Sequence, residues 1–489
     1  MKIEISRRRW IVALLTTLCL GQLLLHTVHA ADFPTNLFIG QIQVLEDPTA
    51  TATLEQILTR RTEFTDVHAP APQFGFTAAA YWLRIPVQNL QPAAKTFYLD
   101  IQNPLLDSVT LYVISNGARQ TTQQSGAQVT ARQRPYLAPT LVFPFPLAAQ
   151  ATAELYVRVQ SHGVTLQIPV AIRDEQTIQR SVTLGWVLSS VLVSMLTAML
   201  LYNLLLLTLL KSRLYLYYVL YLFFAFIAVA IIGGLGPAYL FPNSIWLAIH
   251  GIPFATTMVF ALMSLITREF VVSRTERWLN RWMYFLASLA FVVGIGSLFW
   301  PMRFNYQMLI TMDFVYPLFC FLVGVRALRQ GHTEARFLIA GQLSSWLALV
   351  ITGLVAADIL PYHALVYQGP AVGAVIDALL LSLALADRIR ILQRARITAE
   401  EQARRNLQIH SEELERLVAE RTAEIKTLHG ILPICANCKK IRTDDGAWHA
   451  LETYISQHTD AQFSHGICAD CMQELYPGIY RKQQQNAAR

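Results

Sequence analysis

Long apolar stretches alternate with short polar ones over the middle of the chain, between residues 184 and 386. Each stretch is about 20 residues long, which is the length that an α-helix needs to cross the hydrocarbon core of a bilayer. The stretches cover residues 184–210, 214–233, 245–267, 282–300, 306–328, 336–358 and 364–386. The pattern therefore predicts a seven-helix transmembrane bundle over residues 181–386.

Residues 31–180 show a different pattern, in which short β-branched and aromatic runs alternate with polar residues. Turn sequences such as Asn103-Pro104 separate the runs. We predict strands at residues 81–87, 108–114, 155–159 and 164–168. Several short strands with no helical stretch between them favour an all-β sandwich or jelly roll. The region has no cysteine, and a domain of this size can bury an adequate core without disulfides.

The first 30 residues have the pattern of a secretory signal peptide. Lys2 and the three arginines that end at Arg9 precede an apolar run that reaches about Leu25, and small Ala30 follows. The apolar run is short for a membrane span, so we favour cleavage over a retained anchor. A cleaved signal would leave residues 31–180 as an exported domain.

Basic residues in the loops indicate the orientation of the membrane region. They gather in every second loop and after the last apolar stretch: Lys211, Arg213, Arg268, Arg274, Arg277, Arg281, Arg326, Arg329, Arg336, Arg388, Arg390, Arg394 and Arg396. The loop at residues 234–244 has no charge. Lys and Arg concentrate on the cytoplasmic side, so we predict that the first domain is outside and the C-terminus is cytoplasmic. An odd number of spans after a cleaved signal gives the same orientation.

The composition is typical of a membrane protein. Hydrophobic residues make up 54% of the 489 residues and charged residues only 15%, against about 25% charged in soluble domains. The net charge of +7 is concentrated beside the apolar stretches, where membrane orientation accounts for it. Neither polar region is strongly basic, so we expect no nucleic-acid partner.

Motifs in both regions resemble a known receptor family. In the first region they are Tyr81-Trp82-Leu83-Arg84 with Asn89, Asp107-Ser108-Val109-Thr110-Leu111-Tyr112, and Leu155-Tyr156-Val157-Arg158-Val159. In the membrane region they are residues 200–204, 211–218 and 373–389. Together they resemble the bacterial seven-transmembrane receptors with diverse intracellular signalling modules.

The resemblance implies a bacterial inner-membrane receptor whose periplasmic sensor domain has a jelly-roll fold. It also implies a small, carbohydrate-like ligand for that domain. Within the first motif, we interpret Trp82 as an inward-facing aromatic residue and Arg84 as its solvated neighbour. The ligand-binding residues therefore stay unassigned at this point.

Polar residues inside the predicted spans are costly in lipid, which makes them candidates for function. Asp313 and Asp377 are the embedded acids, and Asn203 is a polar side chain that could partner them. We favour hydrogen bonds that lock the helices together over a signalling switch. A transporter that uses the two acids is an alternative from another class of protein. The spans hold no lysine, which excludes a retinal Schiff base.

Residues 387–428 are charged, lack Gly and Pro, and show a heptad pattern. Leu407, Leu414 and Leu428 occupy one core position, and Val418 and Ile425 occupy the other. We predict a short parallel coiled coil and therefore a homodimer; the alternative is a lone amphipathic helix. Residues 412–425 resemble the connector that enters histidine kinases, but too few residues follow for a kinase domain. We therefore expect no enzymatic activity.

Four of the six cysteines form two close pairs near the C-terminus, Cys435 with Cys438 and Cys468 with Cys471. Two residues between paired thiols suit adjacent corners of a tetrahedral Zn²⁺ site, and two such pairs complete it. His465 is a further candidate ligand. Four protein ligands leave no open position for water, so we expect a structural zinc site. A thiol–disulfide redox relay is the alternative chemistry.

Residues 429–480 resemble a short module appended to bacterial response regulators and sensor proteins, through residues 432–435, 438–442, 463–468 and 475–477. Trp448, Leu451 and Ile455 predict an amphipathic helix between the cysteine pairs. We expect this α+β module to recruit a cytoplasmic signalling protein. Residues 481–489 are predicted to be a disordered tail.

Overall fold

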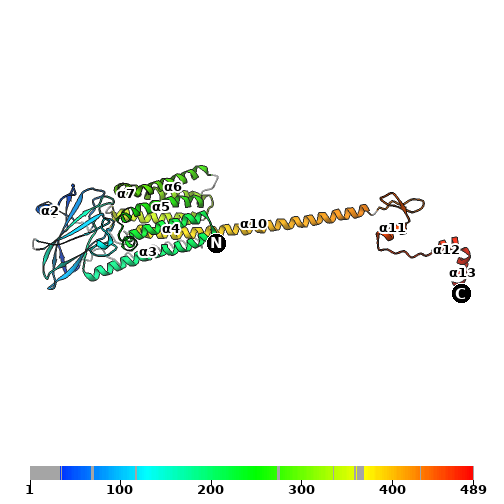
Figure 1. Cartoon of the computed structure of the whole chain (residues 1–489), viewed down its shortest axis with the longest axis horizontal. Helices are drawn as coiled ribbons and strands as arrows, with labels where there is room; N and C mark the ends of the chain where they lie inside the picture. Colours follow the sequence, from blue (N-terminus) through cyan, green and yellow to red (C-terminus); the bar gives the residue numbers. More distant parts are fainter. Residues whose placement is uncertain are drawn as a thin grey trace. The chain divides into compact units, whose positions relative to one another are not determined.

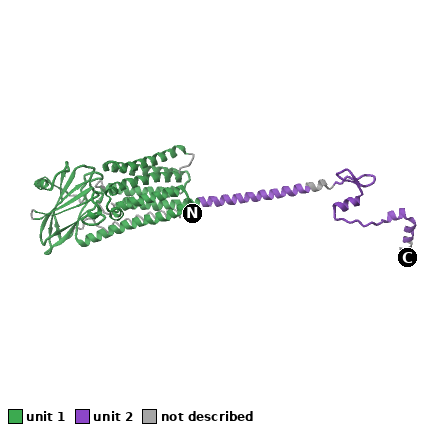
Figure 2. Cartoon of the chain, viewed as in Figure 1, with its two compact units in different colours: residues 1–391 green, residues 392–489 purple. Residues whose placement is uncertain are grey.

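The computed structural model describes residues 34, 36–67, 71–115, 118–271, 276–333, 335–356, 359–360, 368–429 and 431–487. The predicted signal peptide at residues 1–30, and the loop residue Arg274, lie outside these residues. The chain divides into two compact units, residues 1–391 and residues 392–489 (Figure 2). Unit 1 contains a β-domain followed by a helix bundle (Figure 1).

The β-domain consists of two antiparallel sheets, which confirms the predicted all-β sensor region. The larger sheet has the order β3-β2-β4-β9-β6-β7, and β1 also pairs with β4. Its strands are β1 (Leu37–Ile39), β2 (Gln43–Asp47), β3 (Thr65–Asp66), β4 (Ala80–Asn89), β6 (Ser108–Ser115), β7 (Ala118–Ser125) and β9 (Thr152–Gln160). The smaller sheet has the order β10-β5-β8, with β5 (Lys95–Ile101), β8 (Leu141–Leu147) and β10 (Val170–Arg173).

Alternate residues of the strands form the core between the sheets. Leu83 and Ile85 of β4 are fully buried with Phe97 of β5 and with Phe143 and Phe145 of β8. This inward face continues along β6 and β9 with apolar residues at every second position. The period-2 pattern of the sequence therefore gives one buried face for each sheet.

A short helix covers part of the opposite, outer face of the larger sheet. Helix α2 (Leu54–Thr59) buries Leu54 and Ile57 against Trp82 and Tyr156. A capping box between Thr53 and Gln56 begins the helix. The sequence did not predict this helix, because six residues are too few for a clear helical period. Trp82 is fully buried as expected, but beneath α2 rather than between the sheets.

The predicted strand at residues 164–168 is wrong. Its described residues form no strand, and only Gln167 pairs, through an isolated bridge to Gln73. The backbone of this segment instead bonds to the loop at residues 72–75, where the N–H of Leu166 donates to the carbonyl of Gly75 at 2.8 Å. Leu166 and Ile168 of this segment are nevertheless buried in the core between the sheets, although the segment is a strand of neither sheet.

Seven helices among the described residues are long and apolar enough to cross a membrane, which confirms the predicted seven spans. They are α3 (Glu175–Leu210), α4 (Arg213–Ile232), α5 (Ile245–Val271), α6 (Arg277–Ser297), α7 (Met302–Arg329), α8 (Ala335–Ala356) and α10 (Gly369–His429). Helix α3 begins well before the predicted residue 184. The carboxylate of Asp174 caps it by accepting the N–H of Thr177 at 3.1 Å, directly after β10 ends.

The last of these helices, α10, contributes to the core of the bundle. Its small and apolar residues Ala371, Val375, Ala378 and Leu381 are buried in one cluster with residues of the other spans. The helix then continues without a break to His429, and all its side chains from residue 390 to residue 423 are exposed. The heptad residues Leu407, Leu414 and Val418 belong to this exposed stretch. The side chains of Ile425 and Leu428 lie outside the described set, and the coiled coil stays a prediction.

The rest of unit 2 consists of short elements: β11 (Ile441–Arg442), β12 (Trp448–His449), α11 (Leu451–His458), α12 (Ala469–Leu475) and α13 (Pro477–Ala487). The predicted helix between the cysteine pairs is α11, but Trp448 belongs to a strand instead, because it pairs with Arg442. Helix α13 runs through residues for which the sequence predicts a disordered tail.

Candidate functional sites

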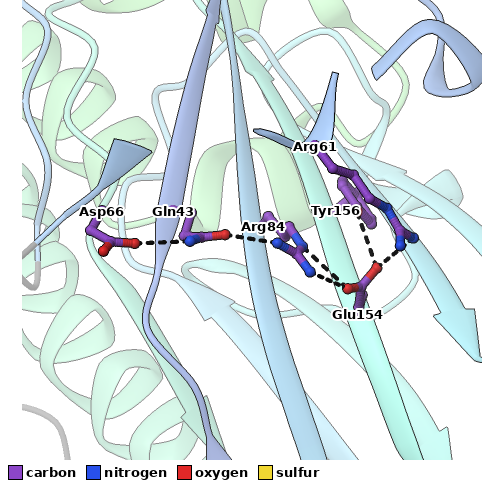
Figure 3. A network of polar contacts seen from close by, with 6 residues as sticks. All are labelled: Gln43, Arg61, Asp66, Arg84, Glu154 and Tyr156. Atoms are coloured by element: carbon purple, nitrogen blue, oxygen red, sulfur yellow. Dashed lines mark hydrogen bonds and ion pairs between the residues drawn. The ribbon is translucent and has the colours of Figure 1, made fainter. Parts of the chain in front are cut away.

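A row of polar side chains crosses the outer face of the larger sheet (Figure 3). The strand register aligns Asp66 of β3, Gln43 of β2, Arg84 of β4 and Tyr156 of β9. The Nε2 of Gln43 donates to Oδ1 of Asp66 at 2.9 Å, and its Oε1 accepts from Nη1 of Arg84 at 2.9 Å. Four neighbouring strands are therefore joined by consecutive side-chain hydrogen bonds.

Glu154 is the acid at the centre of this network (Figure 3). One of its oxygens accepts from Arg84, and the other accepts from Arg61 at 2.8 Å and from the hydroxyl of Tyr156 at 3.1 Å. Burial alone would raise the pKa of Glu154, but the hydrogen bond and charge of Arg84 and the charge of Arg61 outweigh it and lower that pKa. The side chains of Arg84 and Glu154 are each 22% exposed, so the interpretation of Arg84 as a solvated residue is wrong.

A second polar cluster connects the sensor domain to the first span. Asp100 of β5 is buried, and its carboxylate forms an ion pair with Arg173 of β10 at 3.2 Å. It also accepts a 2.6 Å hydrogen bond from the hydroxyl of Thr140. Arg173 in turn donates to the hydroxyl of Ser181 on α3. Burial raises the pKa of Asp100, against the opposing effects of the Arg173 charge and the Thr140 hydrogen bond.

Close backbone contacts complete the junction between the sensor domain and the bundle. Pro139 packs against Gly185 of α3 and Gly234 of the turn after α4, where an added Cβ would lie 3.1 and 3.2 Å from the proline. Gly163 of the sensor domain allows a closer approach by the side chain of Met302, the first residue of α7, which would lie 2.5 Å from an added Cβ. A displacement of the sensor loops would therefore press directly on several spans.

The intramembrane acid Asp377 joins three helices. Its carboxylate on α10 accepts the hydroxyl of Tyr221 on α4 at 2.7 Å and the side-chain amide of Gln342 on α8 at 3.4 Å. Gly341 makes room for this group, because a Cβ there would collide with the carboxylate. Next to it, the hydroxyl of Tyr218 donates to the carbonyl of residue 378 at 2.8 Å. The arrangement holds the seventh span to the second and the sixth.

The other two polar residues predicted inside the spans have different surroundings. Asn203 is buried, but its amide donates to the carbonyl of Met199 in its own helix at 2.8 Å. Asp313 is half-buried on α7 and has no hydrogen-bond or ion-pair partner among the described residues. The structure therefore does not bring Asn203 to either acid.

The first cysteine pair lies in a tight turn. The N–H of Lys439 donates to the carbonyl of Cys435 at 3.0 Å, and Lys439 has a left-handed φ of 64°. The backbone N–H groups of Cys438 and Asn437 point to the sulfur of Cys435 and lower the pKa of its thiol. The backbone of the turn therefore stabilises the charged form of this thiol relative to an ordinary cysteine.

The second pair lies at the start of α12. Cys468 directly precedes the helix, and the backbone and side chain of Cys471 lower the pKa of the Cys468 thiol. Each pair thus has the donor atoms and the turn for half of a tetrahedral thiolate site. Among the described residues, however, no three His, Cys, Asp or Glu side chains lie close enough together to hold a metal ion. Cys435 therefore lies near Cys438 and Cys468 lies near Cys471, but in the ranges that the structure describes the two pairs do not form one site. His465 does not join either pair as a third ligand.

Two family models match the chain. The model described as 7TM diverse intracellular signalling matches residues 186–388, and the model described as 7TMR-DISM extracellular 2 matches residues 39–174. Together the matches span more than two thirds of the chain. The chain belongs to the 7TMR-DISM receptor family. No curated protein matched the chain in the sequence comparison.

Membership gives the two parts of unit 1 their roles. The β-domain is the extracellular sensor of a 7TMR-DISM receptor, and the seven helices are its membrane region. The cluster at Asp100 and the Pro139 contacts lie where these two parts meet. The cysteine pairs lie beyond both matched regions.

Several residues of these sites were missed in the sequence. Tyr221 and Gln342 are polar groups in two of the apolar stretches, and their presence there was the available signal. Asp100 and Arg173 gave no signal, because their pairing depends on the register between β5 and β10.

Proposed function

We propose that this 7TMR-DISM receptor detects a small, hydroxyl-rich ligand outside the cell and passes the signal to a cytoplasmic protein. In this proposal it is a homodimer in a bacterial inner membrane, with its C-terminus in the cytoplasm. It has no enzymatic activity of its own. The observation that carries the proposal is the continuity of α10, which is part of the bundle core at Asp377 and is one helix as far as His429.

The ligand site in this proposal is the polar row on the outer face of the sensor sheet. Arg84, Glu154 and Gln43 present charged and amide groups that are only partly buried. Such groups offer both donors and acceptors, which suits a carbohydrate-like ligand with many hydroxyls. A ligand that competes for Glu154 would loosen the connection between β2, β4 and β9.

The relay in this proposal runs from the sensor junction to the seventh span. The contacts of Pro139 and the Arg173–Ser181 bond carry a displacement of the sensor domain to α3 and to the turn after α4. Tyr221 on α4 contacts Asp377 on α10. A shift of the second span would therefore change the position of the helix that leaves the bundle.

The four-cysteine module is the proposed output. Cys435, Cys438, Cys468 and Cys471 would hold one structural Zn²⁺ that fixes the module in the shape recognised by its cytoplasmic partner. The two thiols of each pair also lie within hydrogen-bond reach of each other, which favours a second candidate, a thiol–disulfide relay. Zinc content together with thiol oxidation distinguishes the two, since a relay would be metal-free and reversibly oxidised.

The transmission of the signal from the sensor domain to the seventh span and its helix can be tested in the full-length protein in nanodiscs. Saccharides are first screened for a shift of the thermal unfolding midpoint. Disulfide cross-linking of Leu414→Cys between protomers is then measured with and without the saccharide that binds. An insertion of four residues after Gln402 rotates the following helix by about 40°, at about 100° per residue, whereas seven residues preserve the heptad seam.

We expect the saccharide to change the cross-linking rate in the wild type and in the seven-residue insertion, but not in the four-residue insertion. Equal responses in all three proteins would show that the helix at residues 387–428 does not transmit the signal. Absence of any cross-link would contradict the dimer. Orientation is tested separately with reporters fused after Leu428 and near Gln176, which should be active in the cytoplasm and outside it, respectively.

A further inference from the structure

Helix α6 carries two adjacent exposed ridges at its first two turns. Arg277 and Arg281 are one turn apart on one ridge, and Trp278, Trp282 and Phe285 follow beside them. The three aromatic side chains are 67%, 41% and 55% exposed. Their rings stack edge to face, with centroids 6.0 Å apart for the two tryptophans and 5.6 Å apart for Trp282 and Phe285.

The two arginines differ from other basic residues at the same end of the bundle. Arg326 pairs with Glu276 at 2.5 Å, and Arg268 pairs with Glu269 at 2.5 Å. Within the described part of the chain, Arg277 and Arg281 are exposed and have neither an ion pair nor a hydrogen bond. Their charges are therefore available to an anion that is not part of this chain.

The opposite face of α6 is the one that packs against the protein. Leu279, Met283, Leu286, Ala287 and Ala290 are buried there. The two exposed ridges consequently face the surroundings of the bundle, which for a span of a membrane receptor is lipid. Helix α5 leaves the sensor side at Ile245 and ends at Val271, so the first turns of α6 lie at the membrane surface away from the sensor domain.

The chemistry of the two ridges matches the headgroup of an anionic phospholipid. A guanidinium group binds a phosphate through two parallel hydrogen bonds. Tryptophan rings prefer the headgroup level, where the ring contacts acyl chains and the indole N–H stays hydrated. The guanidinium groups of Arg277 and Arg281, beside these tryptophan rings, are therefore placed at the depth where the phosphate of a lipid lies.

We propose that Arg277 and Arg281, together with Trp278 and Trp282, bind the headgroup of an anionic phospholipid in the inner leaflet. The site does not depend on the ligand of the sensor domain or on the metal in the cysteine module. A bound lipid would fix the edge of the bundle that α6 forms with α5.

Native mass spectrometry of the full-length protein in detergent, titrated with phosphatidylglycerol or phosphatidylcholine, tests the proposal. We expect preferential binding of phosphatidylglycerol. Each of Arg277→Gln and Arg281→Gln should weaken it about fivefold, the size of one basic residue's attraction to an anionic lipid. Trp278→Ala should weaken the binding of both lipids. Arg329→Gln is the matched control, because Arg329 is an exposed arginine at the same end of the bundle but is not on α6 beside Trp278 and Trp282. It should change the binding of neither lipid.

Several outcomes would overturn the site. An equal loss with Arg329→Gln would mean that the whole basic surface attracts lipid without a defined site. Equal binding of phosphatidylcholine, or full displacement of the lipid by inorganic phosphate, would also contradict it. If a glutamine variant does not fold, the double variant Arg277→Lys/Arg281→Lys keeps both charges and should retain phosphatidylglycerol preference at reduced affinity.

Discussion

The sensor domain and the cysteine module obtain their structure in different ways. The sensor domain has no cysteine, and side chains such as Phe97, Leu99 and Phe143 are fully buried between its sheets. In the module, Ile441 is the only buried side chain among residues 431–483. Large apolar residues such as Trp448 and Leu475 are 48% and 66% exposed there.

This difference indicates what each region needs in order to keep its shape. Apolar burial stabilises a domain by about 25 cal/mol for each Å² removed from water, and the sensor domain has a continuous core of this kind. A segment of fewer than about 60 residues with one buried side chain lacks such a core. A structural metal, whose binding contributes about 10–16 kcal/mol, can replace it.

The largest expected effect therefore concerns the cysteines. Cys435→Ser should abolish zinc binding and leave residues 431–487 open to proteolysis, while the thermal unfolding of the sensor domain stays unchanged. Zinc content measured by mass spectrometry, together with limited proteolysis, checks both parts. Cys320→Ala, which removes a buried thiol from α7, is the matched control and should keep the zinc. A protease-resistant module in metal-free Cys435→Ser would show that the module does not need a metal to keep its shape.

The next effect concerns the buried ion pair of the sensor domain. Asp100→Asn leaves Arg173, whose side chain is 11% exposed, without its charge partner. Such a loss typically costs about 3–5 kcal/mol, measured here as the free energy of unfolding of the sensor domain. Glu63→Gln removes an exposed pair with Arg60 and should leave this free energy nearly unchanged. Equal losses would mean that burial does not determine the stability of this domain.

A smaller effect is expected at Glu154, and it depends on pH. Because the folded protein lowers the pKa of Glu154, its contribution to stability is present above the pKa of the unfolded chain and is lost as pH falls through the folded pKa. Glu154→Gln should therefore cost about 1 kcal/mol at pH 7 and progressively less below the ordinary glutamate pKa of 4.5. Thermal unfolding midpoints over this range give the result. A difference in unfolding midpoint between the wild type and Glu154→Gln that grows toward acid pH would contradict this role of Glu154.

The smallest effect is expected inside the membrane. Tyr221→Phe removes the hydroxyl that bonds to Asp377, and hydrogen bonds between membrane helices are worth about 0.6 kcal/mol on average. Unfolding of the protein in nanodiscs should show this small loss. Thr208→Val, which removes an exposed hydroxyl bonded within α3, should have no measurable effect. A loss of several kcal/mol for Tyr221→Phe would show that the bundle depends on polar contacts as strongly as the sensor domain depends on its core.

The membrane spans and most strands were predictable because they depend on local patterns. Apolar length alone located the seven helices, and period-2 alternation located β4, β6 and β9. The sites were less predictable, because they depend on contacts between distant residues. The row from Asp66 to Tyr156 requires the register of four strands. The partner of Asp377 is Tyr221 rather than Asn203, which only the packing of α4 against α10 reveals.

Hydrogen exchange of the full-length protein, before and after zinc chelation, tests most directly whether the two ends of the receptor are stabilised differently. We predict that the chelator greatly accelerates exchange in α11 and α12 and leaves β4, β5 and β9 protected. The predicted stoichiometry before chelation is about one zinc per chain. A metal-free protein whose α11 and α12 are already protected would contradict the proposed metal-dependent stability of the cysteine module. A chelator that accelerates exchange equally in the sensor domain and the module would contradict it as well.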